Sequence, residues 1–447
     1  MSLVNTAATW ARRAARTEAL RTTALGNALT MGLGFVTGVV TARGLSPSGR
    51  GVLFGVTISG LIVSWLAMLG ADEAIVFAAQ GDRREAERVR RALMAAMRGQ
   101  AIVALVALSA IVLNITRHSA TSTRLICLAS VGVTLPSNIY SMVGAGVLRA
   151  AQDFRHWNAS RVMTPLVYAA LTAALFATGR LTSGTGVAAL AIGSTVTAVA
   201  IRAWLRRAAG EGEPDGPPPA IPALRRYGAQ VTLFGAPNLV NQRLDQFILS
   251  MFIAPAQLGL YSVAIGLSSL TQLLAGTVEQ VMFPMLMTRD VRRRRRITSE
   301  VLAAMFVAGV AVSAALIAAT PSLIRALYGG RYLGATRAAK ILLVGAVFLV
   351  AAAPLIAFGK AADRVRPLIV AQAVAGVVTV CLLVPAIRWY GIRGAATVSA
   401  LAYGVALAVM LGEFARRPRL VANEPPVEAL PGVVDKRAGL GGADAVE

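Results

Sequence analysis

The stretch that decides the fold lies at residues 301–320 and reads VLAAMFVAGVAVSAALIAAT. It holds no charged side chain, and a helix of about 20 apolar residues crosses the roughly 30 Å hydrocarbon core of a bilayer. The basic run Arg292–Arg296 comes just before it, and such a run anchors a helix end at an anionic membrane surface. The stretch therefore predicts a transmembrane helix.

Similar apolar runs lie on both sides of this stretch. The chain is 56% hydrophobic with a mean hydropathy of +0.64, whereas soluble domains are about 45–50% apolar. We predict an all-α polytopic membrane protein with twelve transmembrane helices, at residues 22–42, 51–71, 99–116, 125–147, 162–179, 187–204, 229–252, 258–283, 301–320, 341–358, 368–387 and 394–414.

The positive charge is distributed like that of a membrane protein. A net charge of +23 in a soluble protein would suggest a nucleic-acid partner, but here the basic residues lie in short loops between apolar runs, so no nucleic acid is expected. With the N-terminus inside, 32 of the 44 Lys and Arg fall in inner segments and 11 in outer loops. This excess predicts a multi-pass cell-membrane protein with both termini in the cytoplasm.

The longest polar break divides the predicted helices into two sets of six. Its centre, Gly210–Pro219, is rich in Pro and Gly and cannot form a spanning helix. We expect two six-helix lobes with the following boundaries: a cytoplasmic N-terminus at 1–21, a first lobe at 22–205, a cytoplasmic linker at 206–228, a second lobe at 229–414 and a disordered cytoplasmic tail at 415–447.

The two halves share short sequence matches in the same order. They are Gly51–Val56 with Gly259–Ala264, Ala150–Asp153 with Ala361–Asp363, and Gly186–Ala188 with Gly394–Ala396. Because each half has an even number of helices, duplicated halves would share one orientation and be related by an axis along the membrane normal. The pattern is typical of transporters that hold substrate between two halves.

The clearest candidate site is a polar stripe in the predicted helix 229–252. Pro237 is expected to kink this helix, because proline removes a backbone donor. Arg243 lies roughly opposite the stripe by helix geometry. The stripe either contacts substrate or ions, or forms hydrogen bonds between helices. Its members share one face by their spacing: Asn238, Asn241, Gln242 and Asp245.

Other candidate residues lie nearer the predicted membrane surfaces. Asn27 belongs to a small, mildly polar face that suits either a cavity wall or close helix packing. Arg43 either attracts an anionic headgroup or lies among lipid phosphates. Three acidic residues near the inner surface, Asp72, Glu73 and Glu279, are candidates for ion coupling or gating, or are simply solvated there.

Enzyme signatures are missing from the sequence. We find no phosphate-binding glycine loop, no nucleophile elbow and no His/Cys spacing for a metal, so we expect no catalytic residues, no cofactor and no metal.

The chain resembles the Wzx-type oligosaccharide flippases, a polysaccharide transporter family in the superfamily that also holds the multidrug and toxic-compound extruders and the lipid II flippase. The stretches that carry the resemblance are Thr41–Gly51, Arg243–Asp245 with Ala254–Pro255 and Leu258–Ala264, Phe283–Pro284, Leu327–Thr336 and Tyr390–Ala396.

The resemblance implies a V-shaped bundle of two lobes with a central cationic cavity, in which Arg243 matches the family's intramembrane cation. It implies transfer of a polyprenyl-diphosphate-linked oligosaccharide to the outer leaflet for polysaccharide biosynthesis, with polymerase and ligation machinery as further partners. The first predicted helix has no arginine before Arg43, which departs from the lipid II flippase. An ion-coupled drug or cation extruder is the alternative, supported by the acidic residues Asp245, Glu279 and Asp72.

Overall fold

A computed structural model describes residues 25–79, 81–207, 220–287, 289–362 and 364–416. The predicted N-terminal segment 1–21 and nearly all of the predicted tail lie outside this range, as does the centre of the linker. Throughout the described residues the regular structure is helical. After a first helix, Leu25–Gly44, the elements are α2 (Pro47–Met68), α3 (Ala71–Ala79), α4 (Arg83–Ala96), α5 (Arg98–Ile115), α6 (Thr121–Ala150), α7 (Phe154–Ala177), α8 (Ser183–Arg207), α9 (Ile221–Phe252), α10 (Pro255–Met287), α11 (Val291–Leu323), η1 (Ile324–Tyr328), η2 (Gly330–Ala335), α12 (Thr336–Ala361) and α13 (Val365–Arg416).

The described helices agree with a twelve-helix membrane protein. Ten are long and apolar enough to cross a membrane. One of these, α13, is two helices joined at Gly391, whose φ of 57° and ψ of −134° interrupt the helix. The 32-residue α9 is not among the ten, because its polar residues lower its hydropathy. Counting α9 and both parts of α13 gives the predicted twelve.

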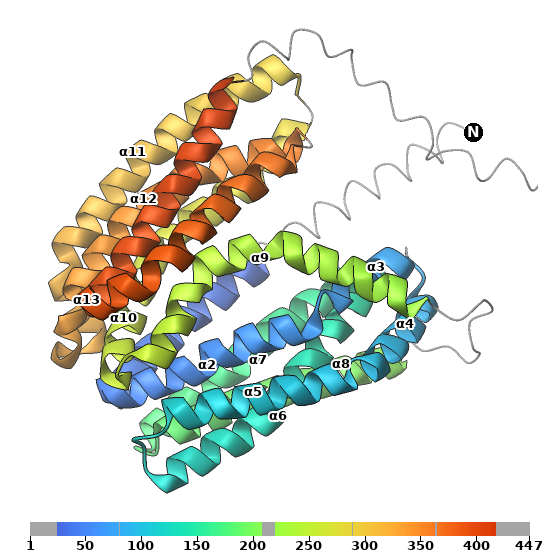
Figure 1. The fold of residues 1–447 in the computed structure, drawn as a ribbon, viewed down its shortest axis with the longest axis vertical. Coiled ribbons are helices and arrows are strands. Elements are labelled where there is room, and N and C mark those ends of the chain that lie inside the picture. The colour runs from blue at the N-terminus through green and yellow to red at the C-terminus, as the bar shows by residue number, and fades with distance from the viewer. Residues whose placement is uncertain (1–24, 80, 208–219, 288, 363, 417–447) are drawn as a thin grey trace, which may run out of the picture.

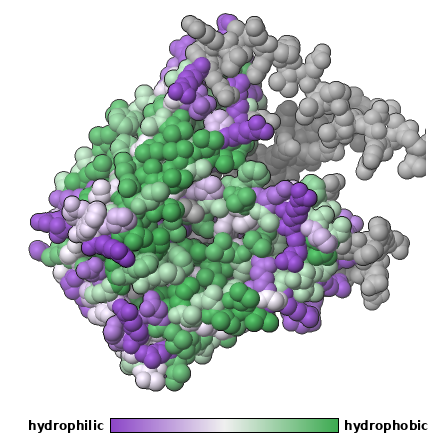
Figure 2. All heavy atoms as spheres, viewed as in Figure 1, coloured by the Kyte–Doolittle hydropathy of each residue, from purple (hydrophilic) through white to green (hydrophobic). Residues whose placement is uncertain are grey.

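The helices form two lobes that converge at one end and diverge toward the other (Figure 1). The first lobe contains the helices up to α8, and the second contains the second half of α9 with α10 to α13. We call the end where α2 and α10 begin the closed end, and the end where α8, α10 and α12 finish the open end. Hydrophobic residues cover the middle of the visible face, and hydrophilic residues gather toward the helix ends (Figure 2). This is the surface that a bilayer requires.

At the closed end the starts of α2 and α10 cross in backbone contact. A Cβ atom added to Gly51 would overlap the carbonyl oxygen of Pro255, and one added to Gly259 would overlap that of Pro47. Each glycine therefore permits an approach that no other residue permits. The two glycines occupy equivalent places in the sequence match between the halves, so the lobes meet through equivalent residues.

Helix α9 connects the lobes. Near its start, Gly228 packs so closely on the first lobe that an added Cβ would lie 2.6 Å from the carbonyl oxygen of Leu69. Its second half packs on α13. The helix changes direction near its middle (Figure 1), where Pro237 lies, as the sequence predicts.

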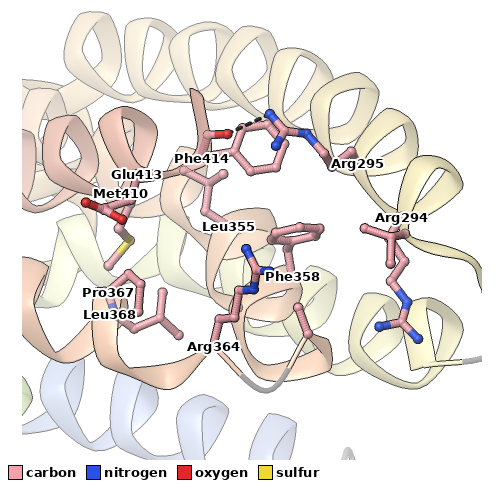
Figure 3. A pocket seen from close by; sticks show the side chains of 13 residues that line it. Arg294, Arg295, Leu355, Phe358, Arg364, Pro367, Leu368, Met410, Glu413 and Phe414 are labelled. Atoms are coloured by element: carbon pink, nitrogen blue, oxygen red, sulfur yellow. Dashed lines mark hydrogen bonds between the residues drawn. The ribbon is translucent and has the colours of Figure 1, made fainter. Parts of the chain in front are cut away.

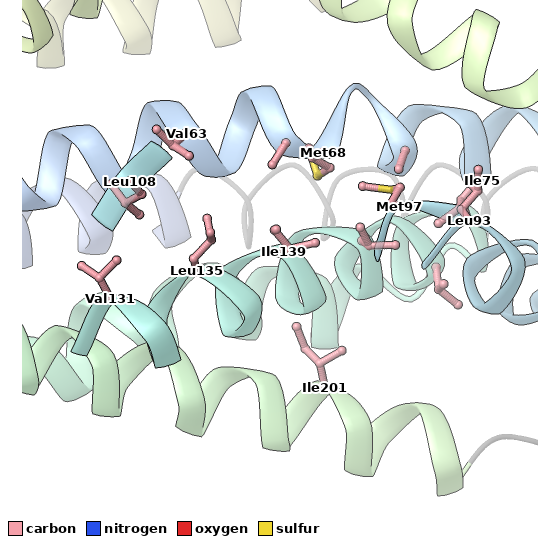
Figure 4. Packing of buried hydrophobic residues seen from close by; sticks show 14 of the residues in the cluster. Val63, Met68, Ile75, Leu93, Met97, Leu108, Val131, Leu135, Ile139 and Ile201 are labelled. Carbon is pink, nitrogen blue, oxygen red and sulfur yellow. The ribbon is translucent and has the colours of Figure 1, made fainter. Parts of the chain in front are cut away.

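The core of the first lobe extends into two short helices at the open end. Asp82 caps α4 by accepting from the backbone N–H groups of Arg84 and Glu85. Ala86, Val89 and Leu93 of α4 are buried against α3 and α6, and Figure 4 shows part of this cluster. The opposite face of α4 is charged, so the helix is amphipathic.

Candidate functional site

The polar stripe of α9 faces the interior of the second lobe. Asn241 and Asp245 are 3% and 4% exposed. The Asn241 amide donates to Oε1 of Gln372 on α13 over 2.8 Å. Gln242 is exposed, and the side chain of Asn238 lies outside the described part of the structure. Two of the four predicted residues thus share one buried face, which contacts helices of their own lobe.

Asp245 lies at the centre of a buried hydrogen-bond cluster. Its Oδ2 accepts from the Tyr261 hydroxyl over 2.5 Å and from the Ser399 hydroxyl over 2.9 Å. Its Oδ1 accepts from the backbone N–H of Gln246 over 2.7 Å. These donors join α9, α10 and α13, so the cluster ties three helices of the second lobe together. Such a carboxylate serves either packing specificity or ion coupling.

Arg243 lies on the other side of α9. It is half-buried, and its Nη1 donates to Oε1 of Gln246 over 3.4 Å. Glu279 makes its ion pair with Lys360 and not with Arg243. Arg243 therefore remains a candidate for an anionic substrate.

The first lobe contains a cavity of about 430 Å³ between α2, α6, α7 and α8. The hydroxyls of Ser141 and Ser194 on its wall are buried without a partner among the described residues. Arg161 also lines the cavity. The polar lining is mostly hydroxyl and amide: Thr57, Ser64, Thr134, Asn138, Ser141, Ser160, Thr164, Ser194 and Thr197. Most of the exposed wall is apolar, and the hydroxyl and amide groups set into it can form hydrogen bonds with a ligand that carries hydroxyls.

Arg161 and the predicted site residue Asn27 meet at this cavity. Nη2 of Arg161 donates to Oδ1 of Asn27 over 2.7 Å, and the guanidinium lies 4.9 Å from the ring centroid of Trp157. Arg161 is exposed, so it can contact a ligand. The sequence counted Arg161 only among the inner-surface charges, and its pairing with a residue 134 positions away gives no local signal.

Two arginines hold the closed end together. Arg43 donates from Nε to the carbonyl of Leu327 over 3.0 Å and also bonds the carbonyl of Ala326. The predicted headgroup ligand Arg43 therefore bridges the first helix to η1 of the other lobe. Arg50 is 6% exposed and donates from Nε to the Ser262 hydroxyl of α10 over 2.7 Å.

Arg50 is also surrounded by aromatic and backbone groups. Its guanidinium bonds the carbonyl of Gly38 and lies 5.5 Å and 5.8 Å from the ring centroids of Tyr328 and Tyr332. Among the described residues it makes no ion pair within 4.0 Å. A buried cation solvated by rings and hydroxyls of the opposite lobe stabilises the contact between lobes.

The three acidic candidates near the open end form equivalent ion pairs within their own lobes. Arg149 of α6 lies 3.4 Å from Asp72 and 2.9 Å from Glu73. Lys360 of α12 pairs with Glu279 of α10. Arg149 comes just before Ala150–Asp153, and Lys360 comes just before the matching segment Ala361–Asp363 of the other half. The duplicated halves therefore repeat this ion pair.

Replacement of Asp72 by asparagine is expected to leave the protein as stable as wild type, or to raise its melting temperature by about 1–2 °C, at pH 7.5. Burial, and secondly the Glu73 carboxylate, raise the pKa of Asp72 despite Arg149. A raised carboxyl pKa destabilises the folded state above that pKa, and this cost disappears below the unfolded value of about 3.9. The rise in melting temperature of Asp72→Asn over wild type should therefore vanish near pH 4, as measured by thermal unfolding of detergent-solubilised protein.

The matched control for this measurement is Glu73→Gln. It removes the carboxylate 2.9 Å from Arg149 and should lower the melting temperature at pH 7.5. A large loss of stability in Asp72→Asn at that pH would show that the ion pair outweighs the cost of burying Asp72.

Solved structures of membrane transporters share this fold at low sequence identity. The chain is similar to the lipid II flippase MurJ in an inward closed conformation, with a TM-score of 0.70, 13% identity and coverage of 88% of this chain and 87% of that one. It is also similar to an inward-facing multidrug resistance MATE family transporter of the MOP superfamily, with a TM-score of 0.65, 14% identity and coverage of 89% and 96%. These similarities confirm the two-lobe membrane fold.

A search of curated proteins gives no match. The model of a polysaccharide biosynthesis protein family matches residues 40–337, which is most of the chain and includes the closed-end contact, the first-lobe cavity and Asp245 with its donor Tyr261. This match confirms the resemblance to polysaccharide transporters, and the chain belongs to that polysaccharide biosynthesis protein family.

Proposed function

We propose that this protein is a flippase that moves a polyprenyl-diphosphate-linked oligosaccharide from the cytoplasmic to the outer leaflet of the cell membrane. The observation that carries the proposal is the first-lobe cavity, in which hydroxyl and amide groups lie beside the exposed Arg161. Hydroxyl groups form hydrogen bonds with sugars, and a guanidinium pairs with a diphosphate. A diphosphate crosses the membrane only where protein groups match its charge.

The orientation follows from the distribution of basic residues. Of the segments predicted to be cytoplasmic, the described parts 81–100, 202–207, 220–228 and 289–300 lie at the open end of the bundle. The open end would therefore face the cytoplasm with both termini, and the closed end the outer surface. In this state the substrate would enter from the inner leaflet, and release would require the contact at Gly51 and Gly259 to separate.

Transport of this kind changes no covalent bond. The product on the outer leaflet is an unchanged lipid-linked oligosaccharide, so enzymes that polymerise or ligate such units would consume it. Alternating access between two lobes needs a source of free energy, and the buried Asp245 is the group best placed to couple transport to an ion.

In cells depleted of the protein, lipid-linked oligosaccharide should accumulate in the inner leaflet, and wild type should clear it. Arg161→Ala and Arg243→Ala should each reduce the initial clearance rate roughly tenfold, because each removes a charge-assisted bond to the diphosphate. The measurement is the transbilayer accessibility of labelled lipid-linked oligosaccharide over time. The matched control is Arg155→Ala, an exposed arginine of α7 that does not line the cavity.

The outcomes separate two functions. If depletion leaves the distribution of the oligosaccharide unchanged, the flippase proposal fails, and the extruder becomes the leading candidate because MATE transporters share the fold. Increased sensitivity of depleted cells to cationic drugs, reversed by wild type but not by Asp245→Asn, would then support the extruder. If Arg161→Ala clears the oligosaccharide at the wild-type rate, the first-lobe cavity does not bind the substrate during transport.

A further inference from the structure

A second cavity lies at the open end of the second lobe. It has a volume of about 150 Å³, and α11, α12 and both ends of α13 form its walls (Figure 3). Every residue that lines it belongs to the second lobe. The cavity is therefore separate from the first-lobe cavity proposed for the substrate.

The charge of this cavity is mainly positive. Arg294, Arg295 and Arg364 line it with one acidic residue, Glu413. Figure 3 shows Glu413 beside Met410 on one side, with Arg295 and Arg294 across the cavity from it. A negatively charged group can therefore bind near the arginines without approaching the Glu413 carboxylate.

Arg295 is placed to bind a phosphate. Its Nη2 donates to the carbonyl of Phe414 over 2.6 Å, and its guanidinium lies 4.6 Å from the Phe414 ring centroid. These contacts cap the end of α13 and hold the guanidinium in place. A guanidinium has five N–H donors. In the described structure, one N–H group of Arg295 donates a hydrogen bond, the one to Phe414. The remaining donors can bind a phosphate through two oxygens.

The rest of the lining is apolar. Leu355, Phe358, Leu368 and Met410 lie between the charged groups (Figure 3). The cavity therefore presents both guanidinium groups and apolar side chains, which suits a phospholipid, because a phospholipid carries both a phosphate and acyl chains. A soluble phosphate would leave this apolar wall exposed to water.

We propose that this cavity binds one anionic phospholipid of the inner leaflet, with its phosphate on Arg295 and an acyl chain along Leu355, Leu368 and Met410. Basic pockets between transmembrane helices on the cytoplasmic side suit such headgroups. The assignment uses the proposed cytoplasmic orientation of the open end and does not depend on which substrate the protein transports. The bound lipid would fasten α11 to the ends of α12 and α13.

The test compares two neighbouring arginines in the full-length protein. Arg295 lines the cavity, whereas the adjacent Arg296 is 82% exposed and pairs with Glu300. Arg295→Gln and Arg296→Gln change the net charge equally. Phosphatidylglycerol and phosphatidylcholine with the same acyl chains are each titrated into detergent-solubilised protein, and the unfolding midpoint gives the apparent affinity.

Phosphatidylglycerol should stabilise wild type and Arg296→Gln to the same extent, with about tenfold weaker apparent affinity for Arg295→Gln. Ala362→Phe, which fills the cavity without changing its charge, should weaken binding similarly. Equal binding to wild type, Arg295→Gln and Arg296→Gln would reduce the effect to surface potential and overturn the proposal. So would no preference for phosphatidylglycerol in wild type, full binding by Ala362→Phe, or equal stabilisation by soluble inorganic diphosphate.

Discussion

Replacement of Gly51 by alanine is expected to prevent closure of the closed end and to reduce substrate clearance more than tenfold. Alanine in a helix interior normally stabilises by about 0.5–1 kcal/mol relative to glycine. At Gly51 the added methyl would overlap the Pro255 carbonyl oxygen, so the starts of α2 and α10 must separate. Gly259→Ala should give the same result, because its methyl would overlap the carbonyl oxygen of Pro47.

The measurement uses a cysteine placed at Leu258, which is 1% exposed and packs against Gly55 of the other lobe. With Cys127 and Cys381 replaced by serine, a membrane-impermeant maleimide should label Leu258→Cys slowly in the wild-type background and rapidly with Gly51→Ala. Gly132→Ala is the control, since its Cβ meets no atom within 4 Å. Slow labelling with active transport in Gly51→Ala would refute the importance of this contact.

Replacement of Arg50 by methionine should also open the closed end and lower clearance at least tenfold. Methionine keeps much of the volume but loses the bond to Ser262 and the two aromatic contacts with Tyr328 and Tyr332. The loss of a charge-assisted bond and two cation–π contacts corresponds to about 2–3 kcal/mol of contact between the lobes. Arg50→Lys should retain part of the activity, since an ammonium cannot make the forked contact.

The same maleimide assay tests this prediction, with clearance measured in parallel. Arg325→Met is the control, because Arg325 lies in η1 near the same end and is exposed. If Arg50→Met keeps the closed end inaccessible and clears substrate like wild type, Arg50 contributes only to the folding of α2.

The spanning helices could be predicted because hydrophobic length is a local property of the chain. All twelve predicted ranges overlap helices of the structure, and the glycines at 51 and 259 stood out as one of the matches between the halves. The helix α4 was not predicted as a separate element. Its signal was present, since the buried Ala86, Val89 and Leu93 recur on one face among charged residues.

The site was only partly predictable because its contacts join distant parts of the chain. Spacing correctly placed Asn241 and Asp245 on one face, but spacing cannot say whether that face meets another helix or a cavity. Their partners, Gln372, Tyr261 and Ser399, are fixed only by the packing of α9 on α10 and α13. The burial of Arg50 likewise depends on residues more than 200 positions later.

The crossing of α2 and α10 is also the point about which the two helices can pivot. From Gly51 to the end of α2 at Met68 is roughly 25 Å at 1.5 Å per residue, about five helical turns. A change in crossing angle that shifts atoms one turn from the contact by about 1 Å would shift the far end of α2 by about 5 Å, by the same helix geometry. Small differences in side-chain size beside the two glycines would thus be magnified into large differences in the width of the open end, and the substrates admitted there could be tuned by residues that never touch them.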